Sequence, residues 1–273
     1  MVIRMKDYAD IARKIRGNVV KMLHRANGSF GGGAMSSADI IAVLFHGHMR
    51  FERKKADSPK RDMFILSKGH SSSALYAGLA SVGIIDEAEL ETYGKNDTKM
   101  IIHPKLGSYP YVDVSTGSLG HGICQATGSA LAARIIGCDA NVFVLMGDGE
   151  CNEGSVWENA AFASKQNLNN LTVIVDRNGL QGCGRDEEVL DYGDIGEKFR
   201  AFGFNVLDID GHDHNAIDEA LKIATSRTLE KPTAIIADTV KGRGISYMED
   251  ELIWHYKSPN DEQLKIALEE LGL

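Results

Sequence analysis

Short apolar runs alternate with longer helix-like segments along most of the chain, and this alternation limits the possible folds more than any other feature. The apolar runs lie at Met63–Leu66, Val142–Met146, Leu171–Val175, Val206–Ile209 and Ala234–Ala237. Such runs are typical of strands whose two faces are both covered, and the segments between them would provide the cover. We therefore predict an α/β fold with a doubly wound, mostly parallel sheet.

The helix-like segments are recognised by apolar residues three and four positions apart. The first runs from Tyr8 to Ala26, and the glycine-rich stretch Gly28–Gly33 ends it. Further helices are predicted at Ser37–Phe45, Ser72–Val82, Gly120–Ile136, Val156–Lys165, Ala216–Thr225 and Asp261–Leu271. Neither an internal repeat nor a Pro/Ser-rich linker divides the chain, so residues 1–273 are predicted to form a single domain.

Composition excludes several classes of protein. The chain is 43% hydrophobic and 25% charged, which is expected of a globular protein rather than a disordered one. Its net charge of −8 provides no basic face for nucleic acid, and no basic amphipathic stretch suggests a membrane surface. The apolar runs are too short to span a bilayer, and the N-terminus has no signal-peptide core. The four cysteines form no C-x-x-C pair. Taken together, these observations lead us to expect a cytoplasmic protein that binds neither nucleic acid nor membrane.

Polar side chains follow two successive strands at the points where each strand ends. Asp148 lies in the turn Gly147-Asp148-Gly149, and Asn178 follows the next strand thirty residues later. One right-handed strand–helix–strand crossover would bring both side chains to the same edge of the sheet. Carboxylate and amide oxygens suit Mg²⁺ or Ca²⁺. The alternative is a pair of unrelated turns, because these residue types are common turn formers.

Two familiar nucleotide-binding motifs are missing from the chain. The segment Gly117-Ser118-Leu119-Gly120-His121-Gly122 does not have the G-x-G-x-x-G spacing of dinucleotide-binding folds. No G-x-x-x-x-G-K-[ST] sequence occurs either. The sequence therefore does not predict a Rossmann or P-loop protein.

Several sequence blocks, taken together, resemble the transketolase family. The turn around Asp148, followed after one crossover by Asn178, is similar to the thiamine-diphosphate motif. The other matching blocks follow in the family's order: Ser67–His70, Ile102–Pro104, Ser115–Gly120, Glu150, Glu153–Glu158, Lys241–Ile245 and Trp254–His255. One block alone would be a weak signal, but several in register from about Ala26 to His255 are specific.

The resemblance implies a thiamine diphosphate cofactor held through Mg²⁺, with Ca²⁺ or Mn²⁺ as possible substitutes. It implies that Asp148, Asn178 and the main-chain carbonyl of Leu180 bind the metal. Gly149 would let the backbone approach the diphosphate. The remaining cofactor contacts implied by the family are Gly117, Ser118, Leu119, Lys241, His70 and His255.

The resemblance also assigns roles to three histidines and one glutamate. His70, His103 and His255 are implied catalytic residues, and the last two would also contact substrate. Imidazole suits proton transfer because its ordinary pKa is about 6.5. Glu153 matches a carboxylate at the subunit interface, although the dipole of a helix N-terminus also favours a glutamate there. The other histidines are predicted to be hydrogen-bonded structural residues: His24, His46, His48, His212 and His214. His121 stands where the family carries Gln.

Phe30 departs from the family pattern. It stands where transketolases carry a histidine that contacts substrate. A phenyl ring neither donates a hydrogen bond nor carries a proton. Phe30 therefore suggests an alternative substrate, such as a sulfonated or branched ketose phosphate in place of an ordinary pentose phosphate.

The length of the chain is a second departure. Transketolases are longer, and their second, pyrimidine-binding domain supplies the glutamate that activates the cofactor. The resemblance therefore implies the N-terminal subunit of a split transketolase, acting on sugar phosphates with a C-terminal partner subunit in an α2β2 heterotetramer. Two other hypotheses stay open: a non-catalytic assembly or regulatory subunit, and a dehydrogenase-type α-subunit that shares the metal motif.

Overall fold

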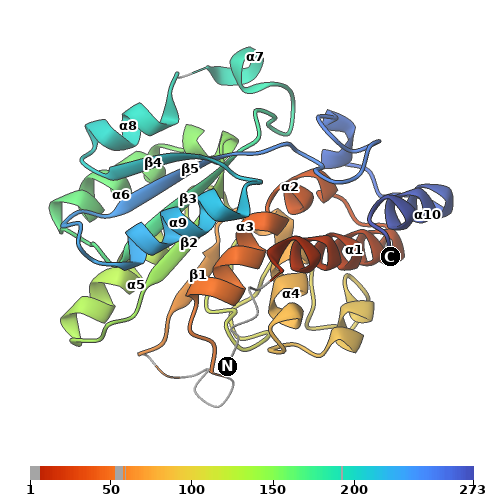
Figure 1. Ribbon diagram of the computed structural model, residues 1–273, viewed down its shortest axis with the longest axis horizontal. Helices are drawn as coiled ribbons and strands as arrows, with labels where there is room; N and C mark the ends of the chain where they lie inside the picture. The colour runs from red at the N-terminus through yellow and green to blue at the C-terminus, as the bar shows by residue number, and fades with distance from the viewer. Residues whose placement is uncertain (1–6, 53–57, 59, 192) are drawn as a thin grey trace.

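Five parallel strands form one sheet in the computed structural model, which describes residues 7–52, 58, 60–191 and 193–273 (Figure 1). Each neighbouring pair of strands is parallel. The order across the sheet is β1 (Met63–Leu66), β2 (Val142–Gly147), β3 (Leu171–Arg177), β5 (Thr233–Asp238) and β4 (Asn205–Asp210). Each strand contains one of the predicted apolar runs, and the predicted α/β fold with a parallel sheet is confirmed.

Helices cover both faces of the sheet because side chains alternate along each strand. In β2, Phe143 and Leu145 point into one core, whereas Val142, Val144 and Met146 point into the other. The first core is covered by α1 (Tyr8–Ala26), α2 (Gly31–Ser36), α3 (Ala38–Val43), α4 (Ser72–Ser81) and α9 (His214–Thr225). The second is covered by α5 (Gly122–Ile135), α6 (Gly154–Lys165) and α8 (Ile195–Ala201).

Shorter elements connect these layers. They are the π-helical turn η1 (Leu44–His48), the 3₁₀ turns η3 (Gly69–Ser71), η4 (Glu87–Thr92), η5 (Gly149–Asn152) and η6 (Leu252–His255), and the helix α7 (Asp186–Leu190). The last helix, α10 (Asp261–Glu270), packs beside α1, where Arg13 donates a hydrogen bond of 3.0 Å to the carbonyl of Leu271 (Figure 1). No helix in the described ranges is both long and apolar enough to cross a membrane.

Two expectations about local structure were wrong. The glycine-rich stretch does end α1, but Gly31–Gly33 then begin α2, and the helix predicted at Ser37–Phe45 is divided between α3 and η1. Glycine is required in α2 because a Cβ at Gly32 would lie 2.8 Å from Cγ of Lys241. The strand β4 is only partly covered, since it forms an edge of the sheet. The helices α7 and α8 were not predicted.

Candidate active site

The loops after β2 and β3 meet at the carboxyl edge of the sheet. Gly147 pairs in register with Asp176, which brings Asp148 and Asn178 together. Oδ2 of Asp148 accepts the N–H groups of Asn178 and Gly179, each at 2.7 Å, and Oδ1 accepts that of Gly149 at 2.8 Å. The Asp148 carboxylate thus joins the two loops, at the edge where the sequence predicts it.

Negative charge is concentrated around Asp148. Burial raises the pKa of Asp148 to about 7, and the carboxylates of Asp186 and Asp176 contribute to this rise. Oδ1 of Asp186 is buried and accepts no hydrogen bond from the described residues. Asp186 lies eight residues beyond Asn178 and was not among the residues predicted from the sequence. A cation among these carboxylates would stabilise their charged forms.

Lys241 reaches the same loops from the turn after β5. Its Nζ donates to the carbonyl of Leu180 and, at 3.3 Å, to that of Gln181. Burial lowers the pKa of Lys241, and Asp148 opposes this effect. The Leu180 carbonyl is also a predicted metal ligand, so the ammonium group and a divalent cation would compete for this oxygen.

A second buried lysine, Lys68, received no role of its own from the sequence. Its Nζ forms an ion pair with Asp176 and donates to the carbonyl of Gly33 at 2.9 Å. The hydroxyl of Ser36 donates to the same carboxylate at 2.6 Å. These bonds tie α2 to the ends of β1 and β3. The sequence signal was present, because Lys68 lies within the matching block Ser67–His70.

Glu150 holds a third loop in place. Its carboxylate accepts hydrogen bonds from the Ser67 hydroxyl, from the N–H of Gly120 at 2.8 Å and from the N–H of Gly147 at 3.3 Å. Burial raises the pKa of Glu150, while these bonds lower it. The carboxylate therefore fixes the segment that carries Leu119 against the end of β2.

Three histidines surround Phe30. The centroid of its ring lies 5.2 Å from that of His70, 6.1 Å from that of His103 and 5.2 Å from that of His255. The rings of His70 and His255 are 5.5 Å apart. The N–H of Phe30 donates to the His255 carbonyl at 3.1 Å. The structure thus gathers the three histidines around the residue that departs from the family pattern.

Burial lowers the pKa of these histidines. The pKa of His70 is lowered to about 3 and that of His255 to about 4, and in both cases Lys68 and Lys241 add to the effect. Burial also lowers the pKa of His103. All three imidazoles are therefore neutral at pH 7, and each has one N–H donor and one acceptor nitrogen.

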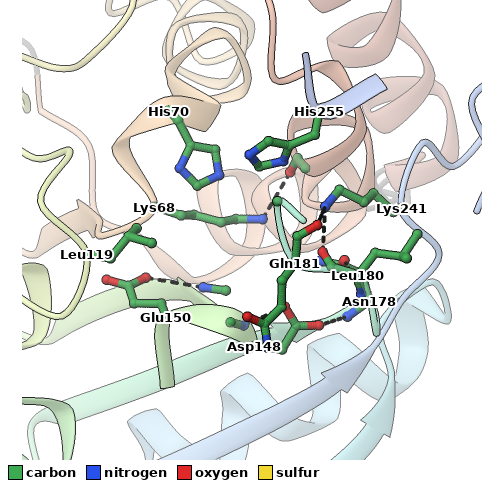
Figure 2. A pocket seen from close by; sticks show the side chains of 14 residues that line it. Lys68, His70, Leu119, Asp148, Glu150, Asn178, Leu180, Gln181, Lys241 and His255 are labelled. Atoms are coloured by element: carbon green, nitrogen blue, oxygen red, sulfur yellow. Dashed lines mark hydrogen bonds between the residues drawn. The ribbon is translucent and has the colours of Figure 1, made fainter. Parts of the chain in front are cut away.

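A cavity of about 210 Å³ joins the acidic loops to two of these histidines. Figure 2 shows His70 and His255 at one end and Asp148 and Asn178 at the other, with Lys68 and Lys241 between them. The lining of the cavity includes these predicted site residues: His70, Leu119, Asp148, Gly149, Asn178, Leu180, Lys241 and His255. The remaining ones lie outside the lining: Phe30, His103, Gly117, Ser118 and Glu153.

The residues outside the lining are placed as follows. Gly117 packs against His103, since a Cβ there would lie 2.8 Å from Cδ2 of the imidazole, and its φ is +148°. Ser118 and Glu153 are both exposed, and Glu153 is the N-cap residue of α6. The five histidines predicted to be structural all bond to a carboxylate or hydroxyl: His24, His46, His48, His212 and His214.

These features define an α/β domain with a cavity at the carboxyl edge of a parallel sheet, where such folds bind their ligands. A family model described as "Transketolase, thiamine diphosphate binding domain" matches residues 8–273. The chain therefore belongs to the transketolase family, as a thiamine-diphosphate-binding domain.

Similar proteins include both separate subunits and longer transketolases. An apulose-4-phosphate transketolase subunit of Actinobacillus succinogenes is 38% identical over 261 residues, which cover 96% of this chain and 93% of that protein. The 6-deoxy-6-sulfo-D-fructose transketolase subunit of a Clostridium species is 35% identical over 240 residues, 88% of this chain and 87% of that one. The transketolase structure from Campylobacter jejuni matches with a TM-score of 0.92 and 29% identity, covering 99% of this chain and 43% of that chain. The chain therefore spans most of each subunit but less than half of the longer enzyme.

The cavity fits the cofactor in the family description. A carboxylate, an amide oxygen and a carbonyl provide the hard oxygen ligands that Mg²⁺ prefers. Gln181 lines the cavity, and its buried Nε2 has no hydrogen-bond partner among the described residues. This residue was not predicted from the sequence. Glycine at position 149 lets the turn after β2 pack closely against this side chain, because a Cβ there would lie 2.9 Å from Cγ of Gln181.

Proposed function

We propose that this chain is the N-terminal subunit of a thiamine-diphosphate- and Mg²⁺-dependent transketolase, which moves a two-carbon ketol unit from a ketose phosphate to an aldose. The observation that carries the proposal is the cavity that joins Asp148 and Asn178 to His70 and His255. When bound, thiamine diphosphate supplies the electron sink for breaking and forming the carbon–carbon bond. The residues of this chain would bind, orient and exchange protons.

The acidic end of the cavity is the proposed metal and diphosphate site. Asp148, Asn178 and the Leu180 carbonyl would bind Mg²⁺, which completes its coordination with water and phosphate oxygens. Because Gly149 has no side chain, the diphosphate could approach the backbone there, and the Lys241 ammonium would supply positive charge. Gly117, Ser118 and Leu119 are the proposed contacts of the aminopyrimidine.

The histidine end is the proposed site of proton transfer. His70, His103 and His255 are neutral at pH 7, so each can accept a proton from a sugar hydroxyl at one nitrogen and donate from the other. His70 and His255 border the cavity, and His103 is held by its contact with Gly117. Substrate would meet His103, His255 and Phe30.

A partner subunit would complete this site. Two relatives of similar length are themselves named as transketolase subunits, which supports a separate pyrimidine-binding subunit here. Glu153 is exposed beside Gly120, as a residue at the contact would be. We propose an α2β2 assembly in the cytoplasm, and the buried thiol of Cys151 suits a reducing compartment.

Phe30 supports a second candidate, in which the same chemistry acts on a modified ketose phosphate. Its ring offers no hydrogen bond to a sugar hydroxyl, and it fills the space between three histidines. Two relatives carry the names of other sugars, apulose 4-phosphate and 6-deoxy-6-sulfo-D-fructose. A sulfonated or branched ketose phosphate is the proposed alternative donor.

Cofactor binding tests the proposed function. Thiamine diphosphate would be titrated calorimetrically, with and without Mg²⁺, into this chain mixed with its pyrimidine-binding partner. Asp148→Asn removes the charged metal ligand, and we expect affinity to fall about 100-fold, the effect of losing about 3 kcal/mol. Glu197→Gln, at an exposed carboxylate, is the matched control. Mg²⁺-independent binding, or equal affinity in both variants, would contradict the proposed site.

The substrate alternative is tested with Phe30→His and Phe30→Leu in a panel of ketose phosphates. We expect the histidine to raise kcat/KM for ordinary pentose phosphates about tenfold relative to modified ones, as one added hydrogen bond would. The leucine keeps an apolar side chain and should leave the preference unchanged. Identical preferences in the two variants would remove the support for a modified substrate.

A further inference from the structure

A hydrogen-bonded chain outside the cavity, buried at Asp39 and half-buried at His212 and Val240, leads to Lys241. It begins at Asp39 of α3, whose carboxylate accepts bonds from Arg16, from Nδ1 of His212 at 2.7 Å and from Nε2 of His214 at 2.8 Å. Burial alone would raise the pKa of Asp39, but the bonds from the two histidines and Arg16 hold it well below its ordinary value. Asp39 is thus a fixed negative charge beneath the loop between β4 and α9.

His212 makes a second bond that distinguishes it from His214. Its Nε2 accepts the backbone N–H of Val240 at 2.8 Å. A backbone amide can only donate, so Nε2 carries the lone pair and Nδ1 carries the hydrogen that Asp39 accepts. The imidazole is therefore neutral and fixed in one tautomer. In the described part of the chain, His214 makes no hydrogen bond to the turn after β5.

Val240 immediately precedes Lys241 in this turn. The turn is anchored on one side by the hydroxyl of Thr239, which donates to Asp176. Gly211 lets the loop that carries His212 approach, because a Cβ there would lie 2.5 Å from Cγ2 of Thr239. His212 thus supplies the side-chain acceptor for the backbone N–H next to the lysine whose Nζ reaches the Leu180 carbonyl.

We propose that His212 is a positioning residue of the cofactor site. Held by Asp39, it fixes the backbone of Val240 and thereby aims the Lys241 ammonium into the cavity. The role of Lys241 toward a diphosphate rests on the function proposed above, whereas the ordering of the turn does not. The two parts of the inference can therefore be tested separately.

Three variants separate the two bonds of His212. His212→Asn retains a donor for Asp39 but is too short to accept the Val240 N–H. His212→Gln places an amide oxygen near the position of Nε2 and restores the acceptor. His214→Asn is the matched control, since it changes a residue on the same carboxylate that does not bond to the turn.

Amide hydrogen exchange of the chain without cofactor or partner tests the ordering of the turn. We expect the Val240 amide to exchange about tenfold faster in His212→Asn, as loss of one hydrogen bond predicts. Exchange in His212→Gln and His214→Asn should stay close to that of the unaltered chain. Equal exchange in His212→Asn and His214→Asn would overturn the proposal.

Kinetics with the partner subunit test the positioning of Lys241. In His212→Asn we expect the KM for thiamine diphosphate to rise about tenfold while kcat at saturation changes less than about twofold, and His212→Gln should restore the KM. Faster amide exchange with an unchanged KM would overturn the positioning role. If the unaltered assembly needed no thiamine diphosphate, the function proposed above would fail, and the exchange result would still decide whether His212 orders the turn.

Discussion

Replacing Lys68, the positively charged partner of the buried Lys68–Asp176 ion pair, should destabilise the fold. The two side chains are only 2% and 0% exposed, so Lys68→Met leaves a buried carboxylate without its countercharge. Loss of one partner of such a pair costs about 3–5 kcal/mol. Asp176 keeps hydrogen bonds from Ser36 and Thr239, so we expect a loss near the lower end, about 3 kcal/mol. That is a large part of the roughly 5–15 kcal/mol that stabilises a typical domain.

Urea unfolding followed by circular dichroism would measure this loss by linear extrapolation. Adding Asp176→Asn to Lys68→Met should recover part of the stability, because the uncompensated charge is then removed. Lys265→Met is the matched control, since its pair with Glu269 is exposed and should contribute nothing measurable. A loss below about 1 kcal/mol in Lys68→Met, or no recovery in the double variant, would refute the reasoning.

Three further predictions concern protonation, backbone fit and assembly. The pKa of His70 is lowered to about 3 in the folded chain, so between about pH 3 and 6.5 the unfolded chain binds one more proton and acidification destabilises the fold. In urea unfolding, His70→Gln should therefore lose less stability between pH 7 and pH 5 than the unaltered chain does, by at most about 1.4 kcal/mol per pH unit. Equal pH dependence would contradict this. Gly117→Ala should lower two-carbon transfer by about tenfold or more, because its Cβ would displace His103, whereas Gly128→Ala, where the space is open, should stay near full activity. Glu153→Ala should weaken association with the partner subunit in analytical ultracentrifugation while Glu158→Ala on the same helix does not; equal association would remove Glu153 from the interface.

The sheet could be predicted from the sequence because apolar runs report burial directly. The run Met63–Leu66 coincides with β1. The strands β2 and β3 extend their runs by one and two residues at the C-terminal end, and β4 and β5 extend theirs by one residue at each end. The pairing of Asp148 with Asn178 also followed, since a single crossover between neighbouring parallel strands fixes where both loops emerge.

Other features depend on contacts between segments that are distant in the sequence. Gly31–Gly33 have the composition of a helix terminator, but they begin α2, and Gly32 packs closely against the distant Lys241. Lys68 and Asp176 are 108 positions apart, and nothing local to either residue indicates an ion pair. His212 was predicted to be an ordinary hydrogen-bonded residue, and only the fold brings it to the backbone of Val240.

The histidine cluster lies between these two cases. The sequence motifs singled out His70, His103 and His255, but their spacing along the chain did not show that they share one neighbour. The structure gathers them around Phe30 and lowers the pKa of each by burial. The substitution of one aromatic residue therefore affects the surroundings of all three.

In the proposed function, this chain contributes the diphosphate half of an active site that a partner subunit completes. Two-carbon transfer should therefore be measured with thiamine diphosphate and Mg²⁺, using this chain alone, a pyrimidine-binding partner subunit alone, and the two mixed. We expect turnover only in the mixture, with loss of activity when Asp148→Asn replaces the unaltered chain. Turnover by this chain alone, or a mixture that binds the cofactor but transfers no two-carbon unit from any ketose phosphate, would contradict the claim.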